Sequence, residues 1–158
     1  MLGQFNSPIV LPPSGNDVPV SGPLKDVDPS AKSAYIVCVL VQGKDNDPDN
    51  AVWVEGRGTW QQGDPNWVGT VSRNGTKPGG GSGSLQPGAG EVRGIATATI
   101  VRDGSVETYV DENGVTKRHL VPPSLDMITW CVGVRVTAQG GQATQTTAAD
   151  TETTEIPA

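Results

Sequence analysis

The sequence predicts an all-β fold, a single antiparallel β-sandwich of about seven strands. Short segments rich in Val, Ile, Thr and Trp recur along the 158 residues, as expected for strands. No apolar pattern with the helical period lasts longer than one turn. Regularly spaced short strands with Gly and Pro turns are typical of sandwiches and also of barrels, and the pattern alone does not separate the two.

Seven segments have the length and composition of strands. They are residues 34–42, 51–60, 67–72, 92–102, 106–111, 115–121 and 127–138. Asn-Gly at 74–75 and 113–114 and Asp-Gly at 103–104 supply the positive φ angles that tight hairpins need. Each of these dipeptides therefore predicts a hairpin turn, and the sequence DENGVT predicts one between the fifth and sixth segments.

The first strand segment, AYIVCVLVQ, is apolar on both faces. Alternate side chains of an extended chain point to opposite sides. A sandwich covers only one face of a given sheet with its second layer, so we expect the other face to be covered by the chain's own arm or by a neighbouring subunit. One face carries Ile36, Cys38 and Leu40, and the other carries Val37, Val39 and Val41.

Residues 1–30 are predicted to form an extended N-terminal arm. Six prolines in this segment oppose a helix and favour extended or polyproline-like backbone. Its apolar side chains would each gain about 1.5–3 kcal/mol on full burial. Two interpretations stay open: a solvated leader, or an arm laid along its own sheet or a neighbour's. The side chains that would make the contacts are Phe5, Ile9, Val10, Leu11, Val18 and Val20.

The remaining chain divides into a β-sandwich domain, residues 31–138, and a Thr-rich C-terminal tail, residues 139–158. Within the domain, the Gly- and Ser-rich residues 77–91 predict a long surface loop. The tail has few apolar groups before Ile156. Its composition predicts disorder, or order only against another surface.

Charge and hydropathy restrict the partners. The formal net charge is −6 and no block of Lys or Arg is present, which opposes binding to nucleic acid or to an anionic membrane. No apolar run is long enough to span a bilayer as a helix. Residues 1–20 lack the features of a secretory signal, so we expect synthesis in a cytoplasm without a signal peptide. The partners expected are protein, glycan or cation.

Cys38, Trp53 and Cys131 resemble the Cys, Trp and Cys landmarks of immunoglobulin-like β-sandwiches, such as those of phage virion surface proteins. The resemblance implies an Ig-like or jelly-roll-like sandwich and a role at a virion surface. It would also imply a bridge between the cysteines. However, Cys131 falls on the opposite side of its strand from Trp130 and Val132, away from the apolar face, so we expect two free thiols.

No residue pattern predicts catalysis, a cofactor or a metal site. His119 is the sole histidine, and no nucleophile motif accompanies it. Asp45, Asp47 and Asp49 could offer oxygen ligands to calcium, but the EF-hand pattern stops after the third Asp. We expect these side chains to bond the backbone of their own loop instead. The protein is therefore expected not to be an enzyme.

Two functions remain for such a chain. The first is a structural assembly subunit, for example a virion decoration, cement or tail-surface protein and a homo-oligomer, which binds neighbours through its arm and through the face of Val37, Val39 and Val41. The alternative is a glycan- or protein-binding module, located at a cell surface, in which Trp60 and Trp67 form a stacking platform. Exposed rings of these two tryptophans would mark the alternative.

Overall fold

The computed structural model describes residues 2–88, 91–139 and 152–157. Within them the chain is almost entirely β-strand, with one short 3-10 turn, Pro48–Asn50, and no α-helix. The all-β class expected from the sequence is confirmed.

Each of the seven predicted segments falls on a strand, and the last one is divided between two. Further strands come from residues 2–25, from the two short strands that follow residue 73, and from residues 152–157. The strands are β1 Leu2–Gly3, β2 Ile9–Leu11, β3 Asp17–Lys25, β4 Ala31–Gly43, β5 Val52–Gln61, β6 Asn66–Ser72, β7 Asn74–Thr76, β8 Ser82–Ser84, β9 Glu91–Arg102, β10 Ser105–Val110, β11 Thr116–Val121, β12 Ser124–Val134, β13 Val136–Ala138 and β14 Glu152–Pro157.

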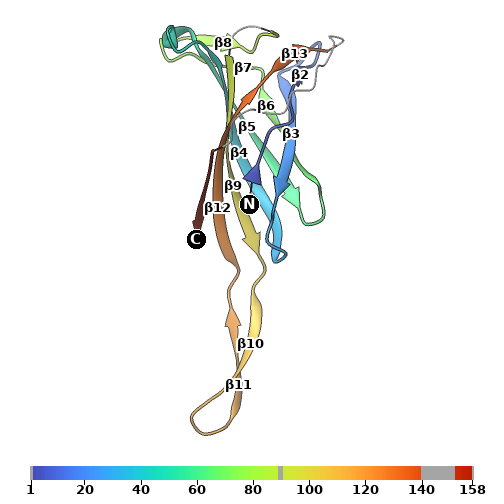
Figure 1. Ribbon diagram of the computed structural model, residues 1–158, viewed down its shortest axis with the longest axis vertical. Coiled ribbons are helices and arrows are strands. Elements are labelled where there is room, and N and C mark those ends of the chain that lie inside the picture. Colours follow the sequence, from blue (N-terminus) through green and yellow to red (C-terminus); the bar gives the residue numbers. More distant parts are fainter. Residues whose placement is uncertain (1, 89–90, 140–151, 158) are drawn as a thin grey trace.

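Most strands belong to one antiparallel sheet with the order β1-β3-β6-β5-β4-β9-β12-β14, extended beside β5 by β7 and β8. The sheet is curled, because β1 at one end of this order also contacts β12 near the other end. Two small pairs lie outside it: β2 runs parallel to β13, and β10 pairs with β11. Figure 1 shows β10 and β11 projecting as a long hairpin beyond the body of the protein.

The interior of the curled sheet is the hydrophobic core. The side chains Ile36, Cys38 and Leu40 of β4 point into it and are buried, as the pleat requires for alternate residues. The sheet's own N-terminal strands fill the concavity, so the arm lies along its own chain. Its buried apolar residues are Phe5, Ile9, Leu11, Val18, Val20 and Leu24.

Three aromatic rings close the curl. Phe5 lies 5.2 Å from Trp67 and 6.5 Å from Trp130, and the two indoles are 6.2 Å apart, measured between ring centroids. Glycines allow this approach: a Cβ on Gly3 would lie 2.5 Å from the Trp130 ring, and one on Gly94 would lie 2.6 Å from the Phe5 ring. These rings therefore bring the segment that follows β1 together with β6 and β12 around one cluster.

Of the three turn predictions, one is confirmed and two are wrong. Gly114, with φ of 77°, occupies the turn between β10 and β11 as predicted. Gly75 lies inside β7 without positive φ, and a Cβ there would overlap the carbonyl oxygen of Trp53. Gly104 also lacks positive φ. It lies between β9 and β10, where the chain continues from the body into the projecting hairpin (Figure 1) and makes no hairpin turn. Gly75 thus provides room for a close approach of backbone and does not form a turn.

The predicted loop and tail are partly ordered against the sheet. The segment 77–88 contains β8, and Leu85 is buried in the core. Residues 152–157 form β14, which pairs antiparallel with β12. The prediction for the rest of the tail, residues 140–151, concerns residues outside those described.

Candidate association surfaces

One face of the central sheet carries a row of apolar side chains that are exposed or half-buried in the described part of the chain, with polar and charged residues beside them. We call it the outer face. Val37 is 56 % exposed, whereas its strand neighbours Ile36 and Cys38 are buried. The register places Val39 between Glu55 on one side and Ile95 on the other. The outer face comprises Tyr35, Val37, Val39, Val41, Trp53, Glu55, Arg57, Thr59, Arg93, Ile95, Thr97, Thr99, Met127, Thr129 and Cys131.

The projecting hairpin carries a second open surface, on which three of six side chains are apolar. The register pairs Val106 with Leu120, Thr108 with Arg118, and Val110 with Thr116. Paired residues share a face of an antiparallel ladder, so these six lie together. We call them the hairpin face. Leu120 is 79 % exposed and Val110 is 67 % exposed, and the hairpin face has no covering layer among the described residues.

The opposite side of the hairpin is occupied by its own polar contacts. Nε2 of His119 lies 3.6 Å from a Glu107 carboxylate oxygen, and the His119 ring packs edge-on against Tyr109 at 5.5 Å. Lys117 lies 3.3 Å from Asp111. The Asp111 carboxylate also accepts hydrogen bonds from two turn amides, and these bonds, with that of Val115 the largest, lower its pKa. The two sides of the hairpin therefore differ: one is paired within itself, and the other carries the exposed Val106, Val110 and Leu120.

Polar contacts fix the root of the hairpin to the body. Arg102, the last residue of β9, forms an ion pair with Asp126 of β12, and both side chains are mostly buried. Its Nε donates to Ser30 Oγ at 3.1 Å, and Ser30 in turn donates to Asp28, whose pKa is lowered by these hydrogen bonds. These contacts hold the start of the hairpin in place while the rest of it extends from the body.

The structure divides the residues that the sequence proposed as partner contacts. Val37 and Val10 are exposed, and Val39 and Val41 are half-buried on the outer face. The other seven pack inside the chain's own core: Phe5, Ile9, Leu11, Val18, Val20, Trp60 and Trp67.

Trp60 and Trp67 form no stacking platform. Trp60 is 5 % exposed and its Nε1 donates to the Asp64 carbonyl, while Trp67 is fully buried and donates to the carbonyl of Gln4. The exposed tryptophan is Trp53, which was not among the contacts expected from the sequence. Strand parity could have found it, because Trp53 alternates with Val52 and Val54 and shares its side of the strand with Glu55 and Arg57.

The two cysteines lie on opposite faces of the sheet and are free. Cys38 points into the core, where burial raises its pKa to about 11. Cys131 is half-buried and stands beside Ile95 on the outer side. The parity argument from the sequence is confirmed, and no bridge forms between them.

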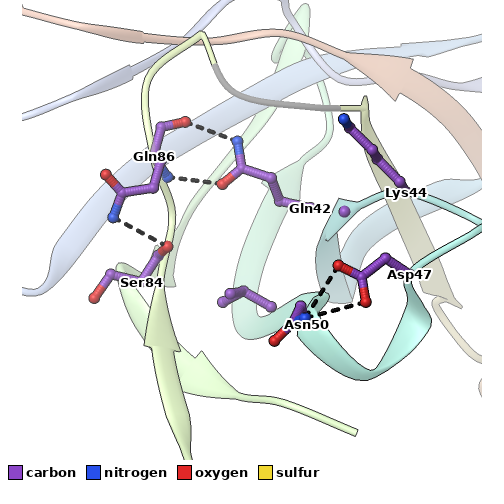
Figure 2. A pocket seen from close by; sticks show the side chains of 8 residues that line it. Gln42, Lys44, Asp47, Asn50, Ser84 and Gln86 are labelled. Carbon is purple, nitrogen blue, oxygen red and sulfur yellow. Dashed lines mark hydrogen bonds between the residues drawn. The ribbon is translucent and has the colours of Figure 1, made fainter. Parts of the chain in front are cut away.

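The acidic loop borders a shallow pocket, which Figure 2 shows. The Gln42 side chain bridges the backbone N–H and C=O of Gln86 at 2.7 Å each. The Asp47 carboxylate accepts from Asn50 Nδ2 at 3.0 Å, and Asp45 binds Arg93 at 2.9 Å. Gln42 with Gln86, and Asp47 with Asn50, therefore bind one another at this pocket. Its lining residues are Gln42, Gly43, Lys44, Asp47, Asn50, Val52, Ser84 and Gln86.

Comparison of the chain with known proteins found no relative. No family model, curated protein or solved structure matches this chain. Within the described ranges, no three His, Cys, Asp or Glu side chains are grouped so that they could hold a metal ion. None of the described residues forms a helix that is both long and apolar enough to cross a membrane.

Proposed function

We propose that the protein is a non-enzymatic structural assembly subunit that binds neighbouring subunits through its outer face. The observation that carries the proposal is the open apolar side of β4, whose other side is fully buried. Full burial of a Val or Leu side chain is worth about 1.5–3 kcal/mol. A contiguous exposed patch of such residues marks association surfaces in soluble proteins.

The kind of assembly is part of the proposal. An all-β chain with an exposed apolar row on its sheet and a net negative charge suits a virion decoration, cement or tail-surface protein. The chain also resembles the Ig-like modules named above. In this proposal the curled sheet corresponds to an Ig-like sandwich, with the strands β3 and β6 facing β9 and β12 across the aromatic cluster. The protein would be made in a host cytoplasm and would reside in the virion.

A charge placed on the outer face tests the proposal. Val37→Lys puts an ammonium group at the centre of the patch, and Val115→Lys is a matched control because Val115 is 53 % exposed at the hairpin turn. Sedimentation velocity over a wide concentration range should show multimers for the wild type and for the control, and a monomer for Val37→Lys. A wild-type chain that sediments as a monomer throughout, or multimers unaffected by Val37→Lys, would overturn the proposal.

A further inference from the structure

We infer that the outer face of one copy is covered by the hairpin face of a second copy of this chain. The inference rests on the proposed function and names the partner of that surface. Both surfaces belong to the same chain, both carry a row of apolar side chains, and no layer of the described residues covers Val37 on one or Val110 and Leu120 on the other.

The two surfaces match in spacing. Val106, Thr108 and Val110 repeat every second residue along β10, as Val37, Val39 and Val41 do along β4. Each row spans about 13 Å at the usual rise of about 3.3 Å per residue. β-Branched side chains with equal spacing can interdigitate when two sheets stack face to face at about 10 Å.

One charge on each surface is complementary to the other. The hairpin face carries one charged group, Arg118, and the outer face carries Glu55 beside Val39, Arg57 beside Val37 and Arg93 beside Val41. Arg93 is paired with Asp45 and Glu91, whereas neither Arg118 nor Glu55 forms an ion pair among the described residues. Arg57 lies two residues along the same face, about 7 Å away, so repulsion from Arg57 favours the register that places Arg118 at Glu55.

The hairpin cannot cover its own outer face. β10 and β11 project from the end of the body and point away from it, as Figure 1 shows. The contact must therefore join two copies, and it is heterologous, because different surfaces of the two copies meet. Such contacts close into rings or continue as filaments.

The contact is small. The hairpin face offers six side chains, whereas a standard stable interface has about 20–30 residues a side. A single pair of copies should therefore dissociate on dilution. An assembly gains stability when each copy makes several such contacts or when the copies bind to a larger particle. Measurements must cover a range of protein concentrations.

Substitutions on the hairpin test the inference. Leu120→Thr removes apolar surface from an exposed strand position and introduces a β-branched side chain that suits a strand, and Val115→Thr is the control on the other side of the hairpin. We expect Leu120→Thr to weaken association by about tenfold and Val115→Thr to leave it unchanged, as measured by sedimentation velocity. Circular dichroism should show the same fold for both variants.

A charge exchange tests the register. Glu55→Arg places two cations side by side with Arg57 and should repel Arg118, which weakens association. The double variant Glu55→Arg with Arg118→Glu should restore it. The inference is overturned if Leu120→Thr associates as tightly as the wild type, or if the double variant associates no better than Glu55→Arg. In either case, loss of multimers in Val37→Lys would still support the proposed function, so the two failures are distinguishable.

Discussion

The strands β9 and β12 in the body and β10 and β11 in the hairpin are continuations of the same two segments, yet they bury very different amounts of surface. In β9, alternate residues such as Val92, Ala96 and Ile100 are buried in the core. In β10 every residue is exposed, and in β11 all but Val121 are. Both regions form ladders, and only the body has a second layer to pack against.

The difference shows that strand formation and burial have separate causes. A ladder needs β-branched residues and a turn, which the hairpin has in Val106, Val110 and the Asn-Gly turn. A two-stranded hairpin alone is marginally stable in water. An apolar face retained on such a hairpin gains its stabilisation from another surface, and the proposed contact with a second copy supplies one.

The largest expected effect lies in the body, at the aromatic cluster. Trp130→Ala should lower the free energy of unfolding by about 3–5 kcal/mol, because it leaves a cavity against Phe5 and Trp67. Trp130→Phe is the control: the indole Nε1 has no hydrogen-bond partner among the described residues, so only the smaller ring size should matter. Urea denaturation measures both. Equal losses for the two variants would contradict the packing account.

A second prediction compares the two faces of the sheet at glycines. Gly94→Val places side-chain atoms against the Phe5 ring and should lower stability by about 1–3 kcal/mol. Gly133→Val on the outer side meets no heavy atom within 4 Å and should change it by less than about 0.5 kcal/mol. Thermal unfolding of both variants checks this. A destabilising Gly133→Val would mean that the outer face is covered within the chain itself.

The smallest effect concerns the turn of the hairpin. The pKa of Asp111 is lowered from its ordinary value of 3.8 by hydrogen bonds from backbone amides. Its contribution is therefore fully present above pH 3.8 and is lost as the pH falls through the lower pKa of the folded state. We expect the amides of Asn113 and Val115 to lose protection in that acidic range, with core amides unchanged. NMR amide exchange measures this, and Asp111→Ala should lose the pH dependence.

Much of the fold could be predicted from the sequence because it depends on local chemistry. The apolar run in β4 and the alternation in β12 predicted these strands, the parity of β12 placed Cys131 outside the core, and Asn113-Gly114 predicted the hairpin turn. These features need only the pleat and the φ preferences of single residues.

The rest depended on contacts between distant segments. Nothing local to Gly75 shows that the Trp53 carbonyl lies against it, and nothing local to Trp67 shows that Gln4 and Phe5 of the arm cover it. The hairpin face was missed for the same reason. The pattern of Val106 and Leu120 indicates a strand, and only the tertiary structure shows that no layer of the described body reaches it.

The most direct test of the account is the quenching of Trp53 fluorescence by acrylamide in the wild-type protein. Of the four tryptophans, Trp53 is 48 % exposed and the other three are at most 5 % exposed. Trp53 lies two residues from Glu55 on the outer face, within the proposed contact. We predict strong quenching in dilute protein that falls as concentration rises, and no such component in Trp53→Phe. Quenching of Trp53 that stays the same at every concentration would contradict the account.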